Sequence, residues 1–460
     1  MSQPSFSILP LQPDLLTNLD LLGYSSMTPI QEQSLPHILA GKDVIAQGKT
    51  GSGKTAAFGL GILQALDSQQ YTIQALVLCP TRELADQVAK EIRNLARTTG
   101  NIKILTLCGG VPFKPQANSL AYGAHVIVGT PGRIEDHLNK ETLNLNHVQT
   151  LVLDEADRML EMGFQTAMDA IVARVPNKRQ TLLLSATFPD NIKGIAKRSM
   201  VDPVTVKVDS THDKESIAQH FFEVGSDEER RKALRLLLLA HQPDSSVIFC
   251  NTKREAQEVT DELIVEGFSA LDLTGDLEQR DRDQTLVKFA NKSISILVAT
   301  DVAARGLDID HLDAVINYEL AHDPESHVHR IGRTGRAGTK GVAFTLFSPK
   351  DGYKLTMLED YLEQPIKVEE LPPLNILNTP ASKATMTTIQ IGGGKKQKVR
   401  AGDILGALTG ENGIQGSKVG KIQIFDQWSY VAVHRNVVHL ALKKLSHGKL
   451  KGRSFRARII

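Results

Sequence analysis

Short, almost continuously apolar runs recur along the chain through residue 347, and a helical stretch separates each run from the next. Strands that are apolar throughout and alternate with helices are typical of parallel sheets covered on both faces. We predict strands at 43–46, 75–78, 102–107, 125–128, 150–153 and 181–184, and then at 246–249, 270–273, 294–298, 314–317 and 342–347. The two series predict two α/β domains, with the polar stretch 202–216 as the hinge between them.

The C-terminal part of the chain has a different pattern. Residues 371–383 contain several prolines and predict a linker. Beyond it we predict strand, helix, strand, strand, helix and strand at 386–391, 401–408, 421–425, 430–433, 437–445 and 454–459. That order belongs to the small α+β ferredoxin-like folds, which include RNA-recognition motifs. We therefore expect domains at 1–205, 206–370 and 384–460.

Composition narrows the class of protein. A chain of 460 residues is too long for a single core, and 41% hydrophobic with 23% charged residues is typical of a globular protein in water. Residues 1–10 lack the basic region and long apolar core of a secretion signal, and the apolar run 234–240 is too short to span a membrane. Cys79, Cys108 and Cys250 each lie in or after an apolar run, which predicts reduced core thiols in a cytoplasmic protein. We expect a monomer that does not associate with membranes.

The net charge of +1 hides an asymmetry along the chain. Residues 383–460 contain 15 Lys and Arg against 3 Asp and Glu, a net charge of +12, so the rest of the chain carries −11. A basic domain on an acidic body favours a polyanionic partner, most simply a nucleic acid. The alternative is a basic tail that serves only solubility.

Two strings predict nucleotide hydrolysis. Residues 48–55 read GKTGSGKT after a predicted strand, a glycine-rich phosphate-binding loop. Its residues are Gly48, Lys49, Thr50, Gly51, Ser52, Gly53, Lys54 and Thr55. Lys54 is expected to reach the β- and γ-phosphates, and Thr55 to give its hydroxyl to Mg²⁺. The cofactor is then a nucleoside triphosphate with Mg²⁺.

The second string, DEAD at 154–157, follows the predicted strand 150–153. Asp154 is expected to hold Mg²⁺, largely through water, and Glu155 to orient the attacking water. Phosphoryl transfer also requires cations on the transferring group. Arg333 and Arg336, three residues apart in the second α/β domain, are the candidates, although exposed arginines at a helix end would look the same.

The ordered set of motifs resembles the DEAD-box RNA helicases over about residues 6–338. The resemblance implies two RecA-like P-loop domains and an ATP-dependent RNA-remodelling enzyme. The strings GY at 23–24 and TPIQ at 28–31 resemble the adenine-reading Q motif of this family. Met27 stands where the family usually has proline. The resemblance implies that Gln31 reads adenine and that Phe6 stacks near the base. It also implies that Asp308 binds the ribose.

The same resemblance assigns RNA-backbone contacts to both α/β domains. These contacts come from strings such as PTREL at 80–84, GG at 109–110, TPGR at 130–133, and ATDVAARGLD at 299–308. The residues implied are Arg82, Gly110, Thr130, Arg133, Thr252 and Thr300. Contacts to phosphates carry no sequence information, so the choice of RNA target must come from elsewhere in the chain.

The C-terminal domain is the candidate for that choice. Its predicted strands offer few aromatic residues for base stacking, and basic loops with Lys395, Lys396, Lys451 and Arg453 dominate. The whole chain resembles the bacterial DbpA-like subfamily of DEAD-box proteins, which implies binding to a hairpin of 23S ribosomal RNA and action during large-subunit assembly. A general RNA chaperone, an ATP-gated RNA clamp and, for the C-terminal domain, a protein-docking module remain alternatives.

Overall fold

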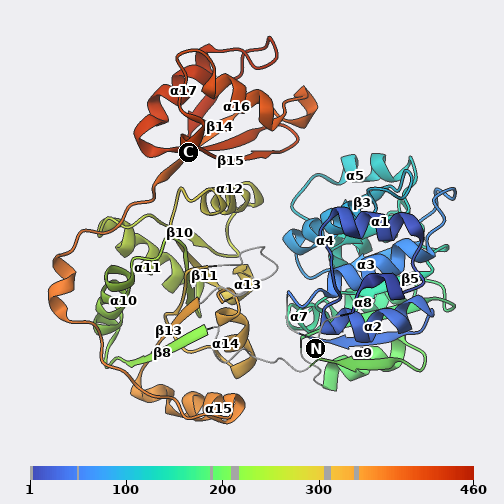
Figure 1. Ribbon diagram of the computed structural model, residues 1–460. Coiled ribbons are helices and arrows are strands. Elements are labelled where there is room, and N and C mark those ends of the chain that lie inside the picture. The colour runs from blue at the N-terminus through green and yellow to red at the C-terminus, as the bar shows by residue number, and fades with distance from the viewer. Residues whose placement is uncertain (1–3, 49–50, 187–189, 209–216, 305–311, 336–340) are drawn as a thin grey trace. The chain divides into compact units, whose positions relative to one another are not determined.

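The computed structural model describes residues 4–48, 51–186, 190–208, 217–304, 312–335 and 341–460. The chain forms two compact units, and the second begins at His212. The first unit contains a seven-stranded sheet, and the second contains a six-stranded sheet and a separate four-stranded sheet (Figure 1). In the part of the chain that the structure describes, no helix has the length and apolar character needed to cross a membrane.

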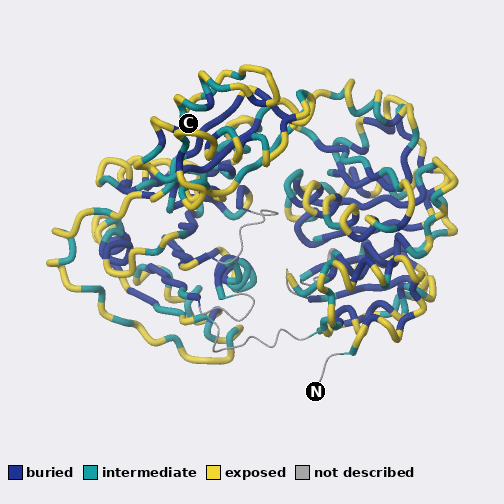
Figure 2. The backbone as a smooth tube through the Cα atoms, turned by 45° about the horizontal axis from the view of Figure 1, so that its top comes forward, coloured by how far each residue is buried: buried dark blue, intermediate teal, exposed yellow. Residues whose placement is uncertain are grey.

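All strands of the first sheet are parallel, in the order β3-β4-β2-β5-β6-β1-β7. The strands are β1 (Val44–Gln47), β2 (Ala75–Leu78), β3 (Ile104–Leu107), β4 (Val126–Gly129), β5 (Thr150–Leu153), β6 (Gln180–Ser185) and β7 (Val204–Lys207). Successive side chains of a strand point to opposite faces. Leu151 and Leu153 pack into one core, and Val152 packs into the other. Figure 2 shows much of the interior of this unit in the dark blue of buried residues. Burial on both faces explains why these strands are apolar throughout.

The helices of the first unit cover the two faces of its sheet. They are α1 (Pro13–Leu21), α2 (Pro29–Leu39), α3 (Lys54–Ala65), α4 (Arg82–Leu95), α5 (Phe113–Leu120), α6 (Pro131–Asn139), α7 (Ala156–Glu161), α8 (Gln165–Val172) and α9 (Asp190–Ser199), with a 3-10 turn η1 (Phe6–Ile8). In α4, the Thr81 hydroxyl caps the first turn by accepting from Leu84 N–H at 3.3 Å. Buried residues in α4 recur at helical spacing from Leu84 to Leu95, which fixes the face that packs on the sheet.

Strand β7 corrects the prediction of a hinge over 202–216. It pairs with β1 in parallel, and Val204 N–H donates to the Asp43 carbonyl at 2.9 Å. Of its four residues only Val206 is buried, because β7 lies at the edge of the sheet. We predicted strands from apolar runs, and an edge strand of four residues with one buried side chain has no such run. The segment was therefore predicted to be a polar hinge. Residues 209–216 lie outside the described part of the chain.

The six-stranded sheet is also parallel, in the order β10-β11-β9-β12-β13-β8. Its strands are β8 (Ile217–Glu223), β9 (Ser246–Cys250), β10 (Ala270–Leu273), β11 (Ile296–Thr300), β12 (Ala314–Asn317) and β13 (Gly341–Phe347). Strand β8 was not predicted, because only Phe221 and Phe222 of this edge strand are buried. Cys250 is buried and free, as are Cys79 and Cys108 in the first unit, which confirms the prediction of core thiols.

In the described residues, six helices accompany this second sheet. They are α10 (Asp227–His241), α11 (Lys253–Val265), α12 (Gln279–Ala290), α13 (Asp301–Ala304), α14 (Pro324–Ile331) and α15 (Gly352–Leu362), with 3-10 turns η2 (Pro349–Asp351) and η3 (Leu374–Asn378). The segment predicted as a linker does not run free. Leu371, Ile376 and Leu377 pack against the core of this lobe, because apolar residues stand between its prolines.

The C-terminal domain is an antiparallel sheet in the order β15-β16-β14-β17, with two helices on one face. Its elements are β14 (Met386–Ile391), η4 (Lys395–Gln397), α16 (Ala401–Thr409), η5 (Gly416–Lys418), β15 (Val419–Ile424), β16 (Ser429–His434), η6 (Arg435–Val437), α17 (Val438–His447) and β17 (Ala457–Ile459). Ile389, Ile391, Val431 and Val433 face the helices. This is the ferredoxin-like order, and the predicted fold class is confirmed in all three parts.

Candidate nucleotide and RNA sites

The turn between β1 and α3 has the geometry of an anion-binding loop. Gly51 and Gly53 have φ of +80° and +95°, and a Cβ on Gly53 would lie 2.5 Å from Gln31 Nε2. Only glycine fits that position. Helix α3 begins at Lys54, so the N–H groups of its first turn and the positive end of its dipole face the loop. Within the described residues, the buried Ser52 hydroxyl has no hydrogen-bond partner, which leaves a donor for a phosphate oxygen.

Two acids follow β5 and act electrostatically on the lysine of this loop. Asp154 is buried, and Glu155 has φ of +50° where it precedes α7. Burial and the charge of Glu155 raise the pKa of Asp154 to about 7, while Lys54 opposes the shift. Burial lowers the pKa of Lys54, and Asp154 opposes that shift. The buried carboxylate of Asp154 next to the half-buried one of Glu155 fits a divalent cation, which would neutralise their repulsion. Thr55 lies in the first turn of α3.

Hydrogen bonds tie the acidic string to the neighbouring strand ends. Asp157 accepts from Arg158 N–H and from Ala186 N–H, both at 3.0 Å. The Ser185 carbonyl accepts from Gly48 N–H at 3.1 Å, at the start of the phosphate loop. These bonds connect the acidic string and the phosphate loop to Ser185 and Ala186 of the string SAT at 185–187, of which Thr187 lies outside the described residues.

The predicted adenine-reading segment also contacts the phosphate loop. The buried Gln31 amide accepts from Thr28 N–H at 2.9 Å and donates to the Gly53 carbonyl at 3.1 Å. The Thr28 hydroxyl donates to the Ser52 carbonyl at 2.8 Å. An amide offers two donors and two lone pairs, so one of each remains for adenine. Phe6 is buried, with its ring 6.1 Å from that of Tyr24 in a T-shaped contact.

The expected RNA contacts of the first lobe follow strands β2, β3 and β4. Arg82 begins α4 and lies 3.6 Å from Asp86. Gly110 is exposed with φ of +72°, and Thr130 immediately precedes α6. Arg133 is more enclosed than expected, because its side chain is only 13% exposed and Nη1 donates to the Val111 carbonyl at 3.0 Å. These residues lie after carboxyl ends of neighbouring parallel strands, where ligands of α/β sheets bind.

The second lobe positions its expected RNA contacts in the same way. Thr252 is exposed and caps α11 by accepting from Glu255 N–H at 3.2 Å. Thr300 ends β11 and is buried. Arg333 lies just after α14, and its carbonyl accepts from Leu312 N–H at 3.2 Å. The predicted residues Lys49, Thr50, Asp308 and Arg336 lie outside the described part of the chain.

Arg330 is a residue that sequence reasoning missed. Its side chain is 1% exposed, and its guanidinium donates to both carboxylate oxygens of Asp301 at 2.7 Å. It also donates to Asn251 Oδ1 at 2.8 Å and to the Glu319 carbonyl at 2.9 Å. Arg330 therefore joins the ends of three strands. The one sequence signal that could have identified Arg330 was its position in α14, the helix that leads to Arg333.

Comparison with known proteins identifies the motifs. The DEAD/DEAH box helicase model matches residues 28–195, the helicase conserved C-terminal domain matches 229–338, and the DbpA RNA binding domain matches 388–459. The ATP-dependent RNA helicase DbpA of Escherichia coli is 54% identical over 451 residues, which is 98% of each chain. The chain belongs to the DEAD/DEAH box helicase family. It is an ATP-dependent RNA helicase.

Other helicases match the two α/β lobes. The ATP-dependent RNA helicase CshA of Limosilactobacillus reuteri is 42% identical over 372 residues, 81% of this chain and 73% of that protein. The structure of S. cerevisiae Dbp5 bound to RNA and ADP BeF3 has a TM-score of 0.73 at 31% identity, and covers 82% of this chain and 100% of that one. The architecture predicted from the sequence is thus shared with a helicase whose structure includes RNA and a nucleotide.

The C-terminal domain of this helicase contacts the second lobe through one face of its sheet. Thr388 and Tyr430 are both buried on the face opposite the two helices. The Thr388 hydroxyl is hydrogen-bonded to Ser293 at 2.6 Å, and the Arg280 guanidinium lies 5.7 Å from the centre of the Trp428 ring. Figure 1 shows α12, which contains Arg280, next to this domain. The few aromatic residues of the sheet are therefore occupied by protein contacts, which fits the predicted lack of a base-stacking platform.

The predicted basic RNA contacts lie away from that covered face. Lys395 and Lys396 are exposed in η4, whose N–H groups donate to carbonyls of the loop before β16. Lys451 and Arg453 are exposed in the last loop, and Lys451 lies 3.3 Å from Asp403. These four cations thus lie on short loops of the C-terminal domain.

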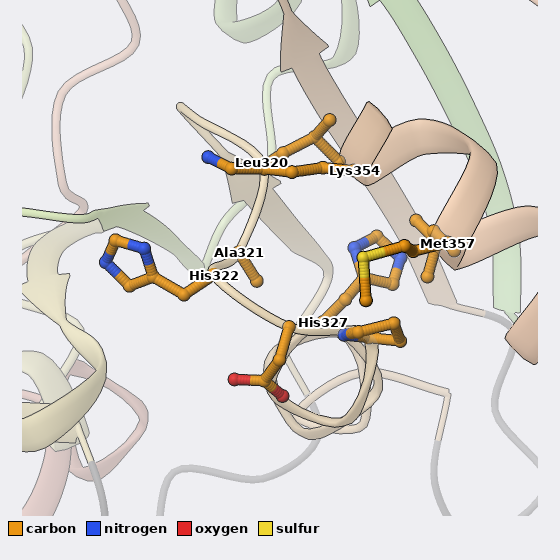
Figure 3. A pocket seen from close by; sticks show the side chains of 9 residues that line it. Leu320, Ala321, His322, His327, Lys354 and Met357 are labelled. Carbon is orange, nitrogen blue, oxygen red and sulfur yellow. The ribbon is translucent and has the colours of Figure 1, made fainter. Parts of the chain in front are cut away.

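A small cavity in the second lobe lies between the segment after β12 and helix α15. Leu320, His322, His327, Lys354 and Met357 are among its lining residues (Figure 3). It offers water-sized molecules a volume of about 10 Å³, room for about one water. It is therefore far too small for a nucleotide.

Proposed function

We propose that this helicase remodels 23S ribosomal RNA during assembly of the large ribosomal subunit, directed to an rRNA hairpin by its C-terminal domain. The observation that carries the proposal is the match of residues 388–459 to the DbpA RNA binding domain, in a chain 54% identical to DbpA over almost its whole length. The net charge of +12 over residues 383–460 supports a polyanionic target.

We assign the ATP chemistry to residues of both lobes. Lys54 and the N–H groups at the start of α3 hold the phosphates, and Glu155 orients the attacking water. Mg²⁺, held by Thr55 and through water by Asp154, would neutralise charge on the phosphates. Arg333 and Arg336 supply cations to the transferring group when the lobes close on ATP and RNA.

We assign RNA-backbone binding to Arg82, Gly110, Thr130 and Arg133 in the first lobe and to Thr252 and Thr300 in the second. Backbone N–H groups beside small residues can approach phosphates closely, and arginines add charge without reading bases. Target choice then depends on Lys395, Lys396, Lys451 and Arg453. With the sheet face covered, recognition of a folded RNA shape is favoured over stacking of an extended strand.

We further propose domain limits of 1–205, 206–370 and 384–460, with 371–383 as the linker. We also propose that the helicase acts in the cytoplasm as a monomer. The free, buried cysteines support a reducing compartment.

RNA-stimulated ATP hydrolysis tests the target. A fragment from the peptidyl-transferase region of 23S rRNA is expected to stimulate the full-length enzyme at far lower concentration than unstructured RNA of equal length. Replacing Lys395, Lys396, Lys451 and Arg453 with alanine should abolish that difference. A control that replaces two exposed lysines of the first unit, Lys42 and Lys178, should retain it.

Equal stimulation by both RNAs in the unchanged enzyme would leave an RNA helicase but refute the ribosomal target, in favour of a general RNA chaperone. RNA held tightly with ATP, but with no turnover, would instead favour the alternative of an RNA clamp. Intact Glu155 and Arg333 argue for turnover.

A further inference from the structure

Two carbonyls enclose the Gly109–Gly110 turn of the first lobe, and side chains hold both of them. The Cys108 carbonyl, before the glycines, accepts from Gln116 Nε2 at 2.9 Å. The Val111 carbonyl, after them, accepts from Arg133 Nη1 at 3.0 Å. Gln116 Oε1 accepts from the same Arg133 nitrogen at 3.1 Å, which joins the two supports.

The hydrogen-bond roles in this network are determined by chemistry. Arginine can only donate, so the Gln116 atom that faces Arg133 is the carbonyl oxygen, and the amide nitrogen faces Cys108. The same oxygen lies 3.1 Å from His137 Nε2, which must therefore carry the proton. His137 Nδ1 then accepts from the Thr142 hydroxyl at 2.8 Å. Burial and the charge of Arg133 lower the pKa of His137 to about 4, so the ring is neutral near pH 7.

Packing supports the same assembly. The Phe113 ring, in the first turn of α5, stacks on His137 with centroids 4.1 Å apart. The Lys140 ammonium lies 4.2 Å from the centre of the Phe113 ring. Helices α5 and α6 are thereby joined through Phe113 as well as through Gln116, and the turn that connects β3 to α5 is held at both ends.

We propose that Gln116 is a positioning residue for RNA binding. Two consecutive glycines lose more conformational freedom on ordering than any other pair of residues, so a free turn would bind phosphates weakly. Gln116 fixes that turn relative to the first turn of α6, which places the N–H groups beside Gly110 and the residue Thr130 in one arrangement before RNA arrives. The inference depends on the proposed role of Gly110 and Thr130 in RNA-backbone binding.

Two substitutions at Gln116 distinguish its hydrogen bond to the Cys108 carbonyl from its hydrogen bonds with Arg133 and His137. Gln116→Met keeps the length of the side chain and removes all three hydrogen bonds. Gln116→Glu keeps an acceptor for Arg133 and His137, so it preserves the join between the helices, but it cannot donate to the Cys108 carbonyl. Asn118→Ala, an exposed position on the same helix, is the matched control.

The measurement is RNA-stimulated ATP hydrolysis by the full-length enzyme, with unstructured RNA. Gln116→Met is expected to raise the half-saturating RNA concentration about tenfold, the effect of losing two or three hydrogen bonds. Gln116→Glu should raise it nearly as much while its melting temperature stays close to that of the unchanged enzyme. For both, the KM for ATP and the kcat at saturating RNA should stay within about twofold, and Asn118→Ala should match the unchanged enzyme.

Salt dependence distinguishes positioning from direct contact. Gln116 and methionine both carry no charge, so Gln116→Met should keep the slope of log affinity against log salt concentration. Arg82→Ala, which removes a proposed phosphate contact, should reduce that slope by about one. If Arg82→Ala behaves so but both Gln116 variants bind RNA within twofold of the unchanged enzyme, the positioning role is wrong. If Arg82→Ala and Thr130→Ala also leave RNA binding unchanged, the proposed RNA surface of this lobe fails, and the inference fails with it.

Discussion

The two α/β lobes share an architecture but differ at the carboxyl ends of their strands. In the first lobe, the turn after β1 contains a buried Ser52 hydroxyl with no partner among the described residues, beside an acid, Asp154, whose pKa is raised to about 7. In the second lobe, the ends of β9 and β11 are joined by the buried Arg330, whose guanidinium donates to Asn251 and Asp301. The first edge combines a glycine-rich loop with the buried Lys54 and Asp154, and the second is held by the ion pair of the buried Arg330 with Asp301.

This difference shows that the layered fold alone does not assign a function to a lobe. A raised carboxylate pKa means that the charged form of Asp154 costs free energy until a cation arrives. A bidentate pair between Arg330 and Asp301 already satisfies its charges, and it orders the strand ends that present Thr252 and Thr300. This fits our proposal that the first lobe holds most of the nucleotide site, while in the second lobe the ion pair fixes the strand ends.

The largest expected effect tests the chemistry of the first lobe. Glu155→Gln keeps the shape of the side chain but removes the carboxylate that we propose orients the attacking water. We expect kcat for RNA-stimulated ATP hydrolysis to fall by about a hundredfold to a thousandfold, with the KM for ATP changed little. Glu141→Gln, at an exposed position of the same unit, is the control. A Glu155→Gln enzyme that keeps more than a tenth of its kcat would rule out this role.

A second prediction concerns the removal of Arg330, the buried arginine of the second lobe. Arg330→Ala leaves Asp301 and the Glu319 carbonyl without their buried donor. Loss of one partner from a buried ion pair costs about 3–5 kcal/mol, so the free energy of unfolding of the second lobe should fall by that amount in urea titration. The binding of ATP analogues, which we assign mainly to the first lobe, should change much less.

Arg254 provides the control for that substitution, because its ion pair with Glu258 is on the surface. Arg254→Ala should leave the urea midpoint unchanged within error. If Arg330→Ala is as stable as Arg254→Ala, the network contributes no stability and the comparison between the lobes loses its physical basis.

The sequence predicted the buried strands well but missed two of the four edge strands of the α/β sheets. Strands β2 and β5, buried on both faces, were predicted at their observed bounds because every residue is apolar or enclosed. Edge strands β7 and β8 were missed because few of their side chains are buried and pairing, not burial, defines them. A local apolar pattern records burial, so the half-buried edge strands β3 and β10 were predicted while β7 and β8, with smaller buried fractions, were not.

Site residues divide in a similar way. The phosphate loop and the acidic string were predictable because glycine at positive φ and adjacent acids after a strand are visible in the sequence itself. The roles of Gln116 and Arg330 were not predicted, because each depends on partners from several separate strand ends and helices. A polar residue in a helix has the same appearance in the sequence whether it faces solvent or joins three strand ends.

The smallest of the predicted effects is a pH dependence of stability. It comes from Glu255 and Glu319, a pair of acids near Arg330. Glu255, in the first turn of α11, faces Glu319, and Asn251 N–H donates to Glu319 at 3.2 Å. Burial, and then the hydrogen bond and charge of Glu319, raise the pKa of Glu255 to about 8 from its ordinary value of 4.5. The folded state therefore holds a proton that the unfolded state releases.

That retained proton fixes the sign of the pH dependence. The stabilising contribution is fully present below about pH 4.5 and declines as pH rises to about 8, because only the unfolded state gains from ionisation in that range. Glu255→Gln, which cannot ionise, should match the unchanged enzyme in melting temperature near pH 5 and exceed it increasingly up to pH 8.5. Glu258→Gln, exposed on the same helix, should show no such divergence. Parallel melting curves for Glu255→Gln and the unchanged enzyme across this range would mean that the two acids of the second lobe do not share a proton, and that the network around Arg330 neutralises both.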